Sequence, residues 1–145
     1  MSNSTRDQFN DLLRSEGLNA GIIPVSNIPN EESRLNEVNR LGILNRDLDQ
    51  EAQYNALTQL AAIITKSQIG LINILGSYIQ QCKTNFGFNV LESTLTEEMP
   101  REISISQYRL ASPQELLIIN DCFLDERTKH FKKLEAYENL RFYAG

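Results

Sequence analysis

The sequence predicts an α+β fold in which helices cover an antiparallel sheet. Three observations lead to this class. Residues 49–66 repeat apolar side chains at helical spacing, residues 69–75 form a short apolar run, and residues 140–145 alternate apolar and polar side chains like a half-buried strand. With 145 residues and 41% hydrophobic content, the chain is long enough for one core and too short for two ordinary domains.

The chain begins with a segment that is expected to be an arm. Residues 1–29 are polar and broken, with one short amphipathic stretch at Phe9, Leu12 and Leu13 followed by glycines and prolines. We expect this arm to pack poorly by itself. The domain proper is expected to span residues 30–145.

The first helix of the domain is predicted after Asn30. Acidic residues in its first turn suit the positive end of the helix dipole, and Gly42 is placed to end it. Its apolar residues at helical spacing are Leu35, Val38 and Leu41.

The second helix, between Asp49 and Lys66, has one broad apolar face. That face is formed by Tyr54, Leu57, Leu60, Ala61 and Ile64. We expect this face to pack on the strands that follow. In a second hypothesis, Leu57 and Leu60 join the apolar residues of the first helix in a dimer or docking face.

The strands follow directly. The run at 69–75 is bounded by Gly76 and Ser77 and is typical of a strand buried on both faces, with 78–84 as its antiparallel return. Residues 89–99 are expected to form a loop with a helical turn.

The last third of the chain returns to alternating helices and strands. A short helix is predicted over 103–110 and a further buried strand over 116–119. Residues 125–138 carry apolar side chains at steps of three, which predicts an amphipathic helix that leads into the strand at 140–145.

Composition and charge exclude several functions. The net charge of −5 argues against a nucleic-acid partner, because phosphate binding uses clustered Lys and Arg. No apolar run is long enough to span a membrane and the first residues do not resemble a secretory signal, so we expect a cytoplasmic protein. Cys82 and Cys122 lack the spacing of a zinc site and imply no disulfide framework.

We expect no catalytic residue and no metal site. The single histidine, His130, lies in a run of charged residues that is typical of a solvated helix face. No sequence motif of a hydrolase, a metalloprotease or a nucleotide-binding loop is present. The adjacent acidic pairs, such as Glu97 and Glu98, would diverge on a helix.

A ligand site would be lined by polar side chains that interrupt apolar strands. Asn73 is one candidate, because a buried amide is costly unless it is hydrogen-bonded; the alternative is that it bonds a neighbouring backbone group. Arg141 and Tyr143 share one face of the last strand by period two and could present a cation and a hydroxyl to an anionic or aromatic ligand. The alternative for this pair is a solvent-facing edge.

Short motifs in a fixed order carry a resemblance to a known family. The motifs are Pro29-Asn30-Glu31, Arg34-Leu35, Leu41-Gly42-Ile43-Leu44, Leu57-Thr58-Gln59-Leu60-Ala61-Ala62, Ile69-Gly70-Leu71-Ile72-Asn73-Ile74, Lys83-Thr84 with Gly87, Pro100-Arg101 with Ser104, Leu117-Ile118-Ile119-Asn120-Asp121, Asp125-Glu126-Arg127 and Leu140-Arg141-Phe142-Tyr143-Ala144-Gly145. Together they resemble the first two-thirds of a bacterial GAF domain, of the kind found ahead of histidine kinases and cyclases. The resemblance implies a regulatory, dimeric, non-enzymatic sensory module of two-component and related signalling systems. It also adds Tyr108, by its position in the family pattern, to the candidate ligand residues.

Departures from the family pattern bear on cofactors. A covalently held linear tetrapyrrole needs a cysteine before a histidine, and here Lys129 precedes His130. The Asp121-Cys122-Phe123 string lacks the residue that separates acid and thiol in a second motif of such photoreceptors. The spacing of Phe123, Asp125 and Glu126 does not match a cyclic-nucleotide site. We therefore expect neither a bilin nor a cyclic nucleotide.

Two classes of function remain. In the first, the chain senses a small molecule or transmits a signal through dimerisation. In the second, it binds no ligand and acts as a dimerisation or docking module. In the family, the strand after Gly145 and a C-terminal helix complete the fold, and that strand runs between the strand at 69–75 and the one at 140–145. Because unmade buried hydrogen bonds cost about 1–3 kcal/mol each, we expect a homodimer or a partner protein to complete the sheet.

Overall fold

The computed structural model describes residues 21–45, 52–88, 98–131 and 140–145. The chain divides into two compact units, one of residues 1–31 with 100–145 and one of residues 32–99. In the described part there are three α-helices, a three-stranded sheet and a two-stranded sheet. The α+β class is thus confirmed, and the resemblance to GAF domains stays a prediction.

The unit of residues 32–99 is built on an antiparallel hairpin. Strands β1 (Gly70–Leu75) and β2 (Ile79–Phe86) pair from Gly70 with Phe86 to Leu75 with Gln80, with an irregularity between Ile72 and Asn73. The sheet order is β1-β2-β3, with β3 at Glu98–Pro100. The hairpin lies within two residues of the strands predicted at 69–75 and 78–84.

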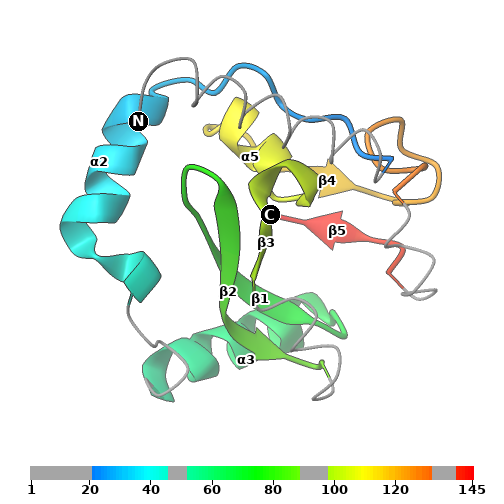
Figure 1. Cartoon of the computed structure of the whole chain (residues 1–145). Helices are drawn as coiled ribbons and strands as arrows, with labels where there is room; N and C mark the ends of the chain where they lie inside the picture. The colour runs from blue at the N-terminus through cyan, green and yellow to red at the C-terminus, as the bar shows by residue number, and fades with distance from the viewer. Residues whose placement is uncertain (1–20, 46–51, 89–97, 132–139) are drawn as a thin grey trace. The chain divides into compact units, whose positions relative to one another are not determined.

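Helix α3 (Ala52–Thr65) lies against this hairpin (Figure 1). Thr58 and Ala62 are its buried residues. A Cβ atom added at Gly70 would lie 2.6 Å from the Thr58 carbonyl oxygen, so the strand approaches the helix more closely than any other residue would permit. The hydroxyls of Thr58 and Thr84 bond to each other inside this contact.

The expected packing face of this helix was therefore wrong. Leu57 and Leu60 are exposed by more than half, and Ile64 is 70% exposed. Tyr54 is half-buried and Ala61 is exposed. The physical reason is the close approach at Gly70, since a helix that presented leucines to the strand would be held further away. Amphipathic spacing identified the apolar stripe, but not the face that packs.

Helix α2 (Glu31–Leu41) agrees with its prediction, and it is followed by the single turn η1 (Ile43–Asn45). The Arg34 side chain donates to the carbonyl oxygens of Leu75 and Gly76, which ties the helix to the end of β1. Gly42 has a positive φ of 59°, as expected for a residue that ends a helix.

The other unit contains η2 (Arg101–Ile103), α5 (Gln107–Ala111), β4 (Ile118–Ile119) and β5 (Tyr143–Ala144). Strands β4 and β5 are antiparallel and pair Ile119 with Tyr143. Two backbone bonds between Leu117 and Gly145, of 2.8 and 2.9 Å, extend the ladder. The terminal strand predicted at 140–145 thus exists in shortened form.

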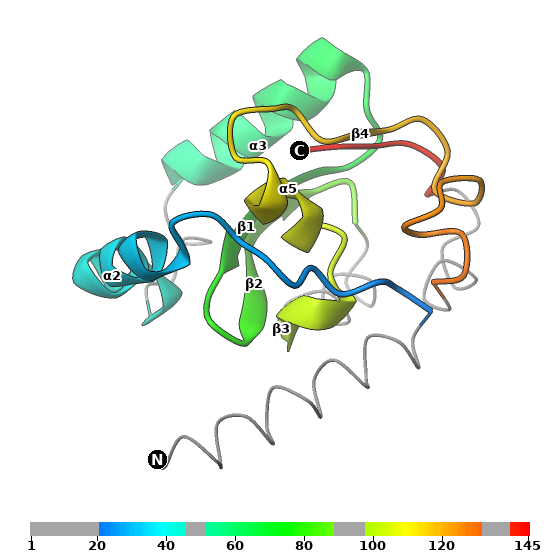
Figure 2. The ribbon, with the colours of Figure 1, turned by 90° about the horizontal axis from the view of Figure 1, so that it is seen from above.

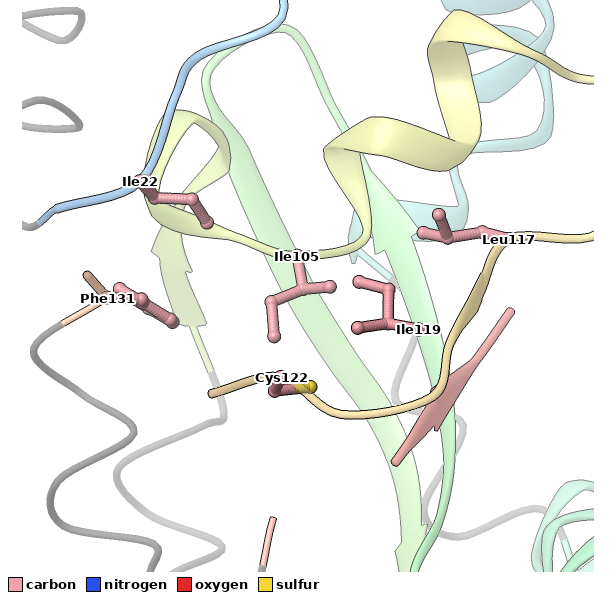
Figure 3. Packing of buried hydrophobic residues seen from close by; sticks show 6 residues of the cluster. All are labelled: Ile22, Ile105, Leu117, Ile119, Cys122 and Phe131. Atoms are coloured by element: carbon pink, nitrogen blue, oxygen red, sulfur yellow. The ribbon is translucent and has the colours of Figure 1, made fainter. Parts of the chain in front are cut away.

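The core of this unit gathers side chains from segments far apart in the sequence. Figure 3 shows its buried residues, which are Ile22, Ile105, Leu117, Ile119, Cys122 and Phe131. Cys82 and Cys122 are not joined by a disulfide bond.

Two elements of this unit differ from expectation. The run at 116–119 is not buried on both faces, because Leu117 and Ile119 are buried while Leu116 and Ile118 are exposed. Similarly, residues 125–131 form successive turns instead of the start of a helix, and residues 132–139 lie outside the described part. A side-chain hydrogen bond that competes with helix formation explains the turns. The Thr128 hydroxyl donates to the Cys122 carbonyl oxygen at 2.8 Å and holds the segment against the preceding loop.

In the described part of the expected arm, one side chain is buried. Ile22 is 1% exposed and lies in the core of the unit formed with residues 100–145. The short helix expected at Phe9 to Leu13 lies outside the described residues, and the domain boundary at residue 29 stays a prediction. No helix among the described residues has the length and apolar character needed to cross a membrane.

Candidate functional site

One polar contact of the unit of residues 1–31 and 100–145 is a pair of hydroxyls beside the core. The Ser106 Oγ and the Tyr143 hydroxyl oxygen lie 3.0 Å apart. Ser106 is buried and Tyr143 packs against the core cluster, and burial raises the pKa of the Tyr143 phenol. The two groups can therefore exchange a hydrogen bond with each other or with a ligand that reaches them.

Local sequence explains how Ser106 is positioned. In the string Ser104-Ile105-Ser106, Ile105 enters the core while both serines are buried on its flanks. The Ser106 backbone N–H donates to the Ser104 Oγ at 3.0 Å, which fixes the turn before α5. The alternation of serine with isoleucine was the sequence signal that could have identified Ser106 as a site residue.

Tyr108, predicted as a ligand residue, is engaged by the protein itself. Its hydroxyl lies 2.8 Å from the Ile23 carbonyl oxygen and 2.9 Å from the Arg127 carbonyl oxygen, and it has one proton for these two acceptors. The Arg127 guanidinium lies 5.6 Å from the centre of the ring. Burial raises the pKa of Tyr108 to about 12, so this group stays a neutral donor at ordinary pH.

Arg141 also has partners within its own unit. Its guanidinium pairs with both carboxylate oxygens of Asp121, one of them at 2.9 Å, and lies 5.0 Å from the centre of the Phe123 ring. The hydrogen bond from Arg141 lowers the pKa of the Asp121 carboxyl. Arg141 is exposed and bonds Asp121, whereas Tyr143 is half-buried and bonds Ser106, so the two side chains have different partners.

Asn73 belongs to the other unit. It lies half-buried on β1 opposite Cys82, next to the irregularity in the β1–β2 pairing. Three of the four predicted ligand residues, Tyr108, Arg141 and Tyr143, are thus in the unit of residues 1–31 and 100–145, and Tyr143 bonds the buried Ser106.

The residues predicted to form a dimer or packing face all lie in the unit of residues 32–99. Leu35 and Val38 are half-buried on α2, whereas Leu41 is exposed at its end. On α3, Leu57 and Leu60 are exposed, next to Ile64. Between Ala52 and Thr65 the helix has no charged side chain.

The described residues include no group of three or more His, Cys, Asp or Glu side chains placed to hold a metal ion. His130 is exposed and lies in the turn before Phe131. In comparisons with known proteins, no family model matches this chain, and a search of curated proteins gives no significant match.

Proposed function

We propose that this chain is a non-enzymatic signal-transduction module of the GAF type, which senses a small molecule or transmits a signal through dimerisation. The proposal draws on the ordered motifs between Pro29 and Gly145 and on the α+β class. It makes the protein a regulatory component of bacterial signalling, located in the cytoplasm.

The observation that carries the sensing function is the hydroxyl pair of Ser106 and Tyr143. Ligand sites are mostly apolar with a few placed polar groups, and this pair lies against an apolar core that includes Ile105 and Ile119. A small molecule with one donor and one acceptor could replace the bond between the two hydroxyls with a bond to each. The ligand is expected to be held without a covalent bond.

A thermal-shift screen of the purified chain tests the sensing function. A ligand present at about 100 times its dissociation constant stabilises the folded state by about 2.7 kcal/mol. Tyr143→Phe removes one hydroxyl and should reduce the shift, while Tyr54→Phe, on the other unit, should not change it. A ligand that shifts all three proteins equally would place its site elsewhere.

A second candidate function, dimerisation or docking without a ligand, is favoured by the exposed face of α3. Leu57, Leu60 and Ile64 follow one another at steps of three and four, the spacing of helices that pair. Because α3 carries no charge between Ala52 and Thr65, two copies of this face meet without burying or opposing charges. The occupant that we propose is therefore a second copy of this chain.

Light scattering with two matched variants of α3 tests this candidate. Leu60→Glu places a charge in the proposed face and should convert a dimer into a monomer. Gln59→Glu places the same charge on the neighbouring exposed residue and should leave the dimer intact. Equal masses for both variants would exclude this face as the dimer contact.

The expected completion of the sheet by a partner chain stays a prediction. Among the described strands, β1 pairs only with β2, and β5 pairs only with β4. Each therefore has a second edge to which another strand can add.

A further inference from the structure

The segment of residues 21–31, which we call the strap, is fixed to the surface of its unit at both ends. It contains no helix or strand before Glu31 and runs past α5 (Figure 2). At its first end Ile22 enters the core, and at its last end the Glu31 carboxylate pairs with Arg101 at 2.6 Å. Residues Ser26 and Asn27 between these ends are exposed.

One side chain of the strap supplies its apolar contact. Ile22 is 1% exposed, whereas the neighbouring Ile23 is 57% exposed. Ile22 joins the same cluster as Ile105 and Phe131 (Figure 3). Successive side chains that point in and out are typical of an extended peptide bound along a surface.

Side chains of α5 bind the main chain of the strap. The Tyr108 hydroxyl lies 2.8 Å from the Ile23 carbonyl oxygen, and the Val25 backbone N–H donates to the Gln107 Oε1 at 2.8 Å. Gln107 is itself fixed, because its Nε2 donates to the Glu102 carbonyl oxygen at 2.8 Å. The strap thus offers an acceptor at Ile23 and a donor at Val25, which lie within hydrogen-bond distance of Tyr108 and Gln107. The Tyr108 hydroxyl shares its single proton with the Arg127 carbonyl oxygen, so the Gln107 bond is the more specific of the two. Any extended peptide could offer the same backbone groups.

The first residue of the strap, Gly21, has a backbone conformation and a close contact that only glycine permits. It has a positive φ of 78°, and a Cβ atom there would lie 1.6 Å from the His130 carbonyl oxygen. Gly42 has a similar φ of 59° with no atom within 4 Å of an added Cβ. An alanine at Gly21 therefore meets both backbone strain and a clash, while an alanine at Gly42 meets the strain alone.

We propose that this surface is a binding site for an extended peptide, with residues 21–25 as its occupant within the chain. A peptide bound in trans would insert a β-branched apolar side chain at the place of Ile22. Its backbone would bond Tyr108 and Gln107 in the place of Ile23 and Val25. Release of the strap removes one of the two acceptors of the Tyr108 hydroxyl and leaves the Arg127 carbonyl oxygen as the other. This inference does not depend on the proposed sensing function.

The strap is covalently linked to the surface that it occupies, and this link determines which protein variants and peptide concentrations the test needs. A segment held by a short chain has an effective concentration in the millimolar range, so a free peptide at micromolar concentration competes poorly with the strap of the unaltered protein. A variant whose strap is displaced should bind the same peptide about tenfold more tightly or better. The full chain is used throughout.

The test is fluorescence anisotropy with a labelled, acetylated peptide of residues 21–28. It is added to the unaltered chain, to Gly21→Ala and to the control Gly42→Ala. We expect binding to Gly21→Ala, and much weaker binding to the other two. A peptide with alanine in place of Ile22 should bind none of them.

A second pair of variants keeps the proposal falsifiable if Gly21→Ala fails to fold. Ile22→Ala removes the buried side chain of the strap, and Ile23→Ala, next to it, removes an exposed one. The peptide should bind the first variant more tightly than the second. Absence of binding to every folded variant would overturn the proposal. It would also be overturned if Gly21→Ala and Ile22→Ala both unfold, because the strap would then be a fixed part of the core.

Discussion

Adjacent alanines on α3 give a sharp test of how this helix packs. Ala62 is 2% exposed and faces Gly70, whose added Cβ would lie 3.4 Å from the Ala62 Cβ, whereas Ala61 is exposed. Ala62→Leu forces three further carbon atoms into this contact and should cost about 1–3 kcal/mol of unfolding free energy. Ala61→Leu adds the same atoms on the outer side, where the change should stay within about 0.5 kcal/mol.

Urea denaturation of the two variants at 25 °C measures the difference. The helix propensities of alanine and leucine are close, so propensity contributes little to either change. Measurements at low protein concentration keep any dimerisation through the exposed face out of the comparison. Equal losses, or a larger loss for Ala61→Leu, would refute the packing face described above and restore the face predicted from the apolar spacing.

Three further predictions concern single side chains. Thr84→Val removes one of the two hydrogen bonds of the Thr58 hydroxyl, which still donates to the Tyr54 carbonyl oxygen at 2.8 Å, and should lower the free energy of unfolding by about 0.5–1.5 kcal/mol in urea titrations, with an unchanged slope. The hydrogen bond from Arg127 lowers the pKa of Asp125 below its ordinary value of 3.8, so this pair stabilises the fold above that pH, and its contribution disappears as the pH falls through the lowered pKa. Asp125→Asn should therefore reduce the urea midpoint at pH 7, and the difference from the unaltered protein should shrink below about pH 4. A difference in urea midpoint that stays constant with pH would contradict this prediction. Burial raises the pKa of the Cys122 thiol, so a thiol reagent should modify Cys82 in the native protein and Cys122 only after unfolding, as mass spectrometry of the labelled peptides would show.

The sequence predicted the local elements of residues 32–86 well. The helix of α2, the hairpin and its turn at Gly76 and Ser77 all follow from short-range signals, which are capping residues, apolar periodicity and turn chemistry. The packing face of α3 could not be predicted in this way. It depends on how closely Gly70 lets the strand approach Thr58, a contact that joins two elements.

The candidate site also depends on contacts between distant segments, which local sequence patterns do not predict. Tyr143 was identified from the alternation of the last strand, but its partner Ser106 lies 37 residues earlier in the chain and has no periodic signal that links the two. The arm of residues 1–29 was expected to pack poorly by itself because it is polar and broken, yet the main chain of its described part bonds Gln107 and Tyr108. Hydrogen bonds from side chains to a backbone segment far away in the sequence cannot be predicted from the composition of that segment.

Above all, we expect the chain to respond to a small molecule or to a second copy of itself. Its most direct test is a melting curve of the purified chain against a panel of small metabolites, recorded together with its mass by light scattering. We expect a ligand that raises the melting temperature by about 5–10 °C at saturation, or a dimer that Leu60→Glu separates and Gln59→Glu does not. A chain that stays monomeric at every concentration and shows no shift with any ligand would contradict it.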